Sequence, residues 1–128
     1  MTRNHLDKYA APVLRFGLVM LFLWFGLSQI ISPGDWVAWV PELASALMPA
    51  HTIILLNGAF ETILGLALAA GFYTRIAALL LSLHLFFIAW EIGYNDVGVR
   101  DFALAVCALS LALFSPDQYT LDKRLRKE

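Results

Sequence analysis

Four long runs of apolar residues constrain this chain more than any other feature of its sequence. They cover residues 12–31, 51–71, 74–92 and 98–115. Each run is long enough to cross a hydrocarbon core of about 30 Å as a helix that rises about 1.5 Å per residue. None alternates between apolar and polar positions, as the strands of a membrane barrel do. The pattern predicts an all-α membrane protein, a bundle of four transmembrane helices.

Composition agrees with this class and excludes others. Of the 128 residues, 60% are hydrophobic and 15% are charged, whereas soluble domains average about 45–50% and about 25%. The net charge of -1 gives no basic surface for nucleic acid. No linker or internal repeat divides the chain, so we expect a single domain over residues 1–128. Its apolar helices would contact the lipid bilayer.

The positive residues predict the orientation of the bundle. Arg100 is the one positive residue expected on the outer side, and the other eight fall on the opposite side: Arg3, Lys8, Arg15, Arg75, Lys123, Arg124, Arg126 and Lys127. Positive residues remain on the cytoplasmic side of a membrane. We therefore expect a multi-pass protein of the cell membrane with both termini in the cytoplasm, Arg75 in the cytoplasmic turn and a basic cytoplasmic tail over residues 116–128.

The connection between the first two spans carries its own signals. Pro33 and Gly34 end the first helix, and Asp35 is a suitable N-cap for a short helix near residues 36–48. Because Trp36 and Trp39 suit the lipid headgroup region, we expect this helix to lie in the membrane interface. A loop is the alternative. Trp24 lies deeper than the headgroup region, where tryptophans usually gather, and it would face either lipid or an internal cavity.

An inner polar layer is expected near the middle of the membrane. Counting about 1.5 Å per residue puts Glu61 and His84 level with each other, about 15 Å from the cytoplasmic end. Arg15 can extend toward them from below, and Asn57 lies one turn above Glu61 on the same face. Charged groups inside membranes face the bundle interior and pair there. These residues form the candidate site, either as a structural brace or as a place for proton or ligand exchange.

A second polar cluster is expected nearer the outer end. It contains Gln29, Glu91, Arg100 and Asp101, and Asn57 can contribute to it from below. At this depth a solvated ion pair competes with a binding site as the interpretation.

The sequence offers no metal or haem site. Each span holds at most one histidine, and the spacing of His, Cys, Asp and Glu matches no metal ligand set. Cys107 is the single cysteine, which excludes a redox-active cysteine pair and favours a small core residue. No catalytic motif is complete within the chain, so whether it is an enzyme is left open. No nucleotide-binding motif is present.

Several motifs together resemble the DoxX family of small four-helix membrane proteins. The stretches LRFGLVMLFLWFGLSQI, ETILGLALAAGFYTRIAALLLSLHL and SPDQYTLD carry the resemblance. The matching positions are Arg15, Phe25 and Gly26, Glu61 and Gly65, Gly71 to Arg75, and Ser115 to Asp122. Gln29 stands where lysine is common in the family.

The resemblance implies a subunit of a membrane complex and suggests a quinone as its ligand. Named members are subunits of quinone-linked oxidoreductases or terminal oxidases, and others belong to assemblies linked to oxidative stress. Distant eukaryotic relatives act as cargo receptors or chaperones. This chain is accordingly expected to be an oxidoreductase subunit or, alternatively, a non-catalytic scaffold, assembly or cargo-binding protein, with other subunits or further copies of itself as partners.

A small proton-coupled transporter is a further alternative, because four helices with one midplane glutamate resemble small multidrug exporters. Those exporters carry the glutamate in the first helix, whereas Glu61 lies in the second span. The strong charge asymmetry also argues against a dual-topology exporter.

Overall fold

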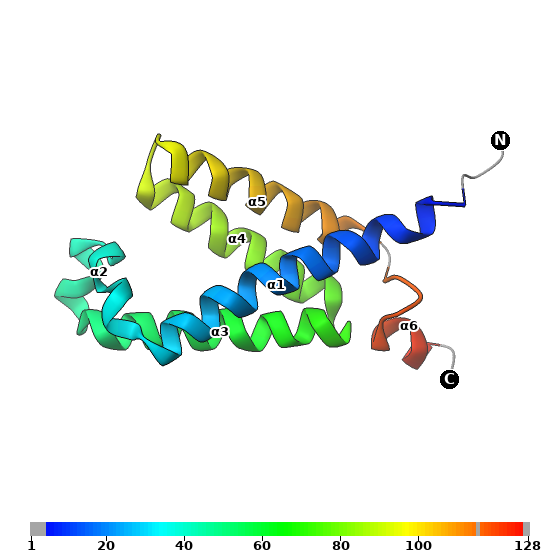
Figure 1. Ribbon diagram of the computed structural model, residues 1–128, viewed down its shortest axis with the longest axis horizontal. Helices are drawn as coiled ribbons and strands as arrows, with labels where there is room; N and C mark the ends of the chain where they lie inside the picture. Colours follow the sequence, from blue (N-terminus) through cyan, green and yellow to red (C-terminus); the bar gives the residue numbers. More distant parts are fainter. Residues whose placement is uncertain (1–4, 115, 127–128) are drawn as a thin grey trace.

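The computed structural model describes residues 5–114 and 116–126, and within them the chain is helical without strands. The long helices are α1 (Ala10–Ile31), α3 (Ala50–Ala70), α4 (Thr74–Ile92) and α5 (Asp96–Leu113). The short elements are the 3-10 helices η1 (Asp7–Tyr9) and η2 (Pro33–Trp39) and the α-helices α2 (Glu42–Leu47) and α6 (Leu121–Arg126). Figure 1 shows the long helices side by side, with α6 beside one end of the bundle.

Three of the helices are long and apolar enough to cross a membrane. They are α1 together with η1, then α3 and α4, and they match the predicted spans 12–31, 51–71 and 74–92. The fourth predicted span, 98–115, corresponds to α5, which begins at Asp96 because the side chain of Asn95 accepts hydrogen bonds from the amides of Val97 and Gly98. Asp96, Arg100 and Asp101 add charge to its first turns. Its crossing of the membrane stays a prediction, and Ser115 lies outside the described residues.

The connection after α1 differs in detail from the predicted helix over 36–48. It contains two short helices, η2 and α2, separated at Pro41. Proline has no amide hydrogen to continue a helix. Pro41 has an extended backbone, with φ of -60° and ψ of 144°, and α2 starts after it as a separate helix. Asp35 lies inside η2 and is not an N-cap, because η2 already begins at Pro33. The position of this segment in the membrane interface stays a prediction.

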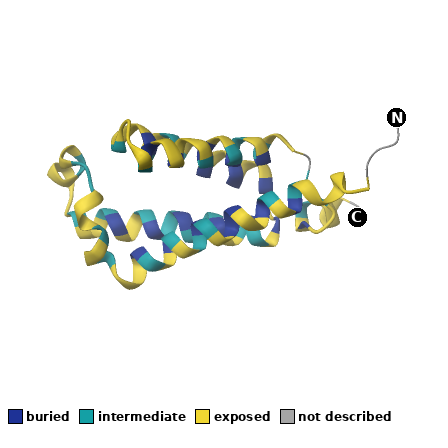
Figure 2. Cartoon of the chain, turned by 45° about the horizontal axis from the view of Figure 1, so that its top comes forward, coloured by how far each residue is buried: buried dark blue, intermediate teal, exposed yellow. Residues whose placement is uncertain are grey.

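The long helices form two pairs. α1 packs mainly on α3, and α4 packs mainly on α5, while α3 and α4 are joined by a tight turn. Figure 2 shows the two layers, with most buried residues on the helix faces inside the bundle. The buried apolar core includes Phe22 of α1, Leu68 of α3, Leu81 of α4 and Ala105 of α5. The layers are joined most closely near the α3–α4 turn and separate toward the end that carries η2 and α2 (Figure 1).

Small residues let α1 and α3 cross closely. A Cβ atom added at Gly58 would lie 2.8 Å from the carbonyl oxygen of Gly26, and one at Gly26 would lie 2.8 Å from the amide nitrogen of Thr62. Gly65 faces Leu23 of α1 in the same way. Gly58 and Gly65, which lie on one face of α3, thus form a packing surface for α1.

The α3–α4 turn depends on a glycine. Gly71 ends α3 with a φ of 72°, and its amide and that of Phe72 donate to the carbonyl oxygens of Leu68 and Ala67. This pattern is a Schellman motif, which favours glycine at the left-handed position. A Cβ at Gly71 would also lie 2.5 Å from that of Thr120. The turn therefore requires glycine for its backbone and for its contact with the C-terminal segment.

Candidate functional site

The centre of the molecule holds a buried acid–histidine pair. Nε2 of His84 on α4 lies 3.1 Å from Oε1 of Glu61 on α3. The exposed fractions of their side chains are 18% and 5%. The predicted inner layer is correct for these two residues, because the antiparallel α3–α4 hairpin places positions equally distant from the turn beside each other. The ring of Phe60 lies 4.8 Å from that of His84 and covers one side of the pair.

One oxygen of this pair has no partner. Oε2 of Glu61 is buried and forms no hydrogen bond within the described residues. A buried carboxyl oxygen without a partner costs free energy whether the group is ionised or protonated. The pair therefore has unused hydrogen-bonding capacity in the middle of the bundle. This distinguishes it from a fully satisfied structural brace.

Arg15 does not reach Glu61, contrary to its predicted role in the inner layer. Its guanidinium group is fully buried and donates to the carbonyl oxygens of Leu68 and Ala69 at 2.7 and 3.0 Å. It also donates to Asp117, with Nε 3.0 Å from Oδ2. Because α1 runs antiparallel to α3, Arg15 lies level with the C-terminal end of α3. The free carbonyls there and the nearby carboxylate are closer partners than Glu61.

The predicted outer cluster does not form as one group. Nδ2 of Asn57 donates to Oε1 of Gln29 at 2.7 Å, which ties α1 to α3 above the Glu61–His84 pair. Arg100 pairs only with its neighbour Asp101, at 3.4 Å, and 57% of the Arg100 side chain is exposed. Glu91 is exposed and makes no hydrogen bond or ion pair among the described side chains. Asn57 therefore belongs with Gln29 and not with the inner pair.

The C-terminal segment forms a second polar centre, which we call the terminal clasp: Asp117, Thr120 and Asp122 with Arg15. Its anchor to the α3–α4 turn is Asp122, whose two carboxylate oxygens accept hydrogen bonds from the amides of Tyr73 and Thr74, both at 2.7 Å. Arg75, predicted in the turn, donates to the carbonyl oxygen of Phe114. Burial alone would raise the pKa of Asp122, but these hydrogen bonds, chiefly from Thr74, and the charge of Arg126 hold it below its usual range.

Sequence reasoning did not find the part that Asp117 takes in the clasp. The motif SPDQYTLD contains Asp117, but nothing in the sequence pairs it with Arg15. The two residues are 102 positions apart, and no helical spacing links them. The contact depends on α6 folding back across the end of the bundle.

Metal-binding geometry is not evident in the part of the chain that the structure describes. No three His, Cys, Asp or Glu side chains in residues 5–114 and 116–126 are grouped as metal ligands. Cys107 is a free thiol of intermediate burial that packs against the apolar core. The Glu61–His84 pair is thus the arrangement best suited to exchange a proton or to bind a polar group.

Together these features define a small, all-helical membrane protein with an acid–histidine pair buried between its helices. The DoxX family model matches residues 10–93, which include α1 to α4 and both members of the pair. The chain belongs to the DoxX family, as the sequence motifs indicated. The matched range ends before α5 and the terminal clasp. No curated protein and no solved structure matches the chain.

Proposed function

We propose that this chain is a membrane subunit of a quinone-linked redox complex and that the Glu61–His84 pair is its quinone-binding and proton-exchange site. The observation that carries the proposal is the buried, unpartnered Oε2 atom of Glu61 beside a histidine ring. A carboxyl group and an imidazole are the common protein groups that exchange protons near neutral pH.

Two features of the residues around the pair support a quinone head group as the ligand. The ring of Phe60 offers an apolar aromatic face beside His84, and the pair supplies hydrogen bonds to a carbonyl oxygen. A quinone takes up electrons and protons together when it is reduced. In this proposal the Glu61–His84 pair passes on, one after the other, the two protons that convert a quinone to a quinol, and water on the aqueous side replaces each proton. The electrons come from a redox-active partner subunit, so the proposal requires a complex.

Quinone binding to the purified chain in lipid nanodiscs tests this proposal. A short-chain ubiquinone or menaquinone analogue is titrated and followed by equilibrium dialysis. We expect Glu61→Gln and His84→Leu each to weaken binding about tenfold, since each removes a hydrogen bond to a desolvated polar ligand. Glu91→Gln removes an exposed carboxylate from α4 and should leave binding unchanged.

The redox readout separates binding from proton exchange. In membranes that contain the partner complex, Glu61→Gln should slow quinone reduction and change its pH dependence. Unchanged binding and unchanged reduction in both Glu61 and His84 variants would overturn the proposal. Thermal unfolding in detergent shows whether a variant that loses binding is still folded.

A non-catalytic scaffold is a second candidate, favoured by the separation of the two helix pairs. α1–α3 and α4–α5 separate at the end that carries η2 and α2 (Figure 1). Large side chains are exposed on both pairs, including Trp24 on α1 and Phe87 and Trp90 on α4. Such a surface can receive a helix of another membrane protein. Cross-linking in native membranes followed by purification should recover a stoichiometric partner through α4, and recovery of the free chain alone would count against this role.

A further inference from the structure

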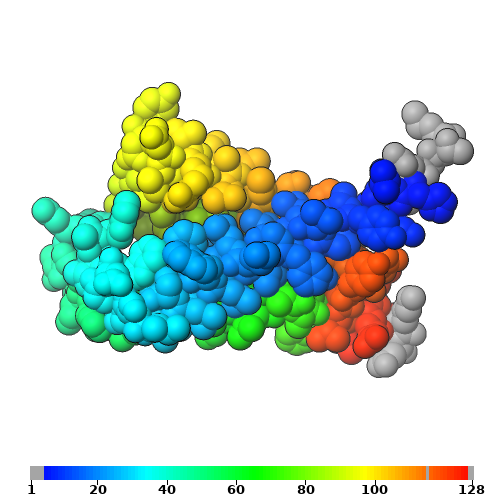
Figure 3. Space-filling model, viewed as in Figure 1, coloured from blue at the N-terminus to red at the C-terminus, as the bar shows by residue number. Residues whose placement is uncertain are grey.

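An open notch lined by tryptophan lies at the end of the molecule opposite the terminal clasp. Figure 3 shows the segment of η2 and α2 and the turn between α4 and α5 as separate projections at this end. The notch has a volume of about 310 Å³, and its lining residues are Trp24, Ser28, Ser32, Asp35, Trp36 and Trp39. This volume lies at the lower limit of small-molecule sites, which span about 300–1,000 Å³.

Two of the three tryptophan rings of the notch, Trp24 and Trp36, pack on each other and on Phe25 behind them. Trp36 packs edge-to-face on Trp24 and on Phe25, with ring centroids 6.4 and 5.5 Å apart. Trp24 also packs edge-to-face on Phe25 at 5.0 Å. Edge-to-face contacts fix the ring orientation. A ligand would therefore meet preformed aromatic faces and need not order them.

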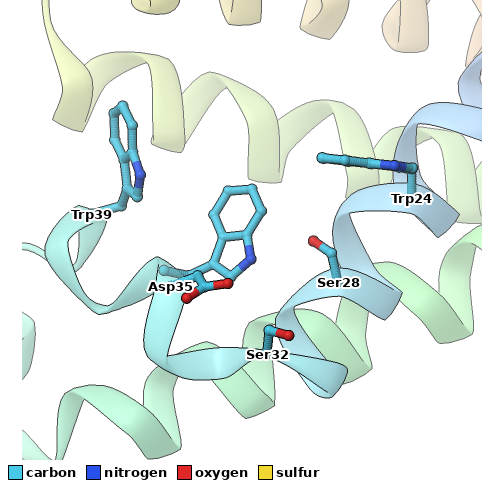
Figure 4. Close-up of a pocket in the computed structure, with 6 residues that line it drawn as sticks. Trp24, Ser28, Ser32, Asp35 and Trp39 are labelled. Atoms are coloured by element: carbon cyan, nitrogen blue, oxygen red, sulfur yellow. The ribbon is translucent and has the colours of Figure 1, made fainter.

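A carboxylate lies among these rings. Figure 4 shows Asp35 between Trp39 on one side and Trp24 on the other, with Ser28 on the side of Trp24 and Ser32 below. Among the described residues Asp35 forms no ion pair with a cation. The notch thus combines negative charge with the electron-rich faces of indole rings, and both attract a cation.

We propose that this notch binds the quaternary or primary ammonium group of an organic cation. Tryptophan is the aromatic residue that attracts cations most strongly, and aromatic cages with a carboxylate suit alkylammonium groups better than small hydrated metal ions. The headgroup of a zwitterionic lipid and a soluble organic cation both carry such a group, and the chemistry of recognition is the same for both. The site is separate from the Glu61–His84 pair and does not depend on the function proposed for it.

Tryptophan fluorescence of the full chain in nanodiscs of phosphatidylglycerol, titrated with tetramethylammonium chloride, tests the proposal. Sodium chloride at equal concentration controls for ionic strength. We expect a saturable change with tetramethylammonium that sodium does not reproduce. Asp35→Asn and Trp36→Leu should each weaken the apparent affinity about five- to tenfold.

Two matched variants serve as controls. Trp90→Phe removes a tryptophan that is 83% exposed and lies outside the notch, and Glu42→Gln removes the acidic residue in the first turn of α2. Both should keep the affinity of the unmodified chain. An absent or unsaturable response, an equal response to sodium, or equal affinity in the Asp35 and Trp36 variants would overturn the proposal.

Nanodiscs of phosphatidylcholine then identify the source of the cation. If the lipid headgroup occupies the notch, tetramethylammonium should lose most of its effect in these nanodiscs. An unchanged response there assigns the notch to soluble organic cations. Either result supports an ammonium site, and each identifies a different natural ligand.

Discussion

The buried guanidinium group of Arg15 has a hydrogen-bond partner for each of its three nitrogens. It is bonded to two carbonyl oxygens at the end of α3 and to both oxygens of Asp117. The positive charge lies at the negative end of a helix dipole and beside a carboxylate that is only 6% exposed. Glu61 lacks this completeness, since one of its oxygens has no partner. The two buried side chains therefore differ: the guanidinium group of Arg15 is bonded to the end of α3 and to Asp117, whereas Glu61 has an oxygen without a hydrogen bond among the described residues.

Replacing Arg15 tests the structural role. Arg15→Leu leaves the buried carboxylate of Asp117 without its charged partner and removes the donor to the carbonyl oxygen of Ala69. We therefore expect the free energy of unfolding to fall by about 3–5 kcal/mol. Arg15→Lys keeps the charge but loses the fork of donors, and its loss should be smaller. Chemical unfolding in detergent micelles measures both. Arg100→Leu breaks an exposed pair and should cost less than about 1 kcal/mol, so equal losses at the two sites would contradict this account.

Asp122 predicts how the stability responds to acid. Burial raises the pKa of its carboxyl group. The hydrogen bonds from Thr74 and Tyr73 and the charge of Arg126 together lower this pKa by more than burial raises it, so it lies below the usual 3.8. A carboxylate with a depressed pKa stabilises the fold above its unfolded pKa, and this contribution is lost as pH falls through the folded value.

The variant Asp122→Asn should therefore unfold more easily than the unmodified chain at neutral pH, by about 1 kcal/mol as for a lost helix cap. The difference should shrink as the pH falls from the unfolded pKa of about 3.8 through the lower pKa of the folded state, because the carboxyl group of the unmodified chain then becomes protonated. Thermal unfolding across this range measures it. A difference that stays constant with pH would show that the charge of Asp122 does not contribute.

Among the elements, the crossing of α1 and α3 depends most on side-chain size. Gly26 and Gly58 bring the two backbones so close that no side chain fits between them. The same pair of helices carries the bond between Gln29 and Asn57 and holds α3 in position for Glu61. Close packing in one helix pair thereby sets the geometry of the candidate site on the other side of α3.

Adding a methyl group at this crossing should separate the helices. We expect Gly58→Ala to lower the free energy of unfolding by about 1–3 kcal/mol, the usual cost of overpacking. Gly17→Ala is the control, because Gly17 lies on α1, the other helix of this crossing, and a Cβ there meets nothing within 4 Å. Unfolding in detergent compares the two. A loss at Gly17 as large as that at Gly58 would indicate a helix effect and not a packing effect.

At the scale of the whole molecule, the arrangement of the two helix pairs determines which ends of the bundle lie on the same side of the membrane. If α5 also crosses the membrane, the turn between α4 and α5 and the terminal clasp lie on opposite sides. Asp96, Arg100 and Asp101 then lie at the outer end of α5, where water can solvate them. The positive-inside rule predicts that the C-terminal part of the terminal clasp and the basic residues of α6 face the cytoplasm.

Site-directed labelling tests this topology, since Cys107 is the single cysteine. In a Cys107→Ser background, Tyr94→Cys places a thiol at a fully exposed position of the α4–α5 turn, and Gln118→Cys places one in the exposed clasp loop. In intact bacterial cells, a maleimide that does not cross membranes should label the Tyr94→Cys variant but not the Gln118→Cys variant. The Gln118 variant should react after lysis. Labelling of both in intact cells would contradict a fourth span.

The sequence by itself determined the helices, because apolar runs of this length and glycine at Gly71 leave a chain few other structures. Antiparallel pairing and depth counting also predicted that Glu61 and His84 would meet, since both are counted from one short turn. Only the tertiary structure decided the partner of Arg15, the cluster of tryptophans around Asp35 and the separation of Asn57 from the inner pair. These contacts join residues far apart in the chain, and they depend on the packing angles of whole helices, which local sequence patterns do not encode.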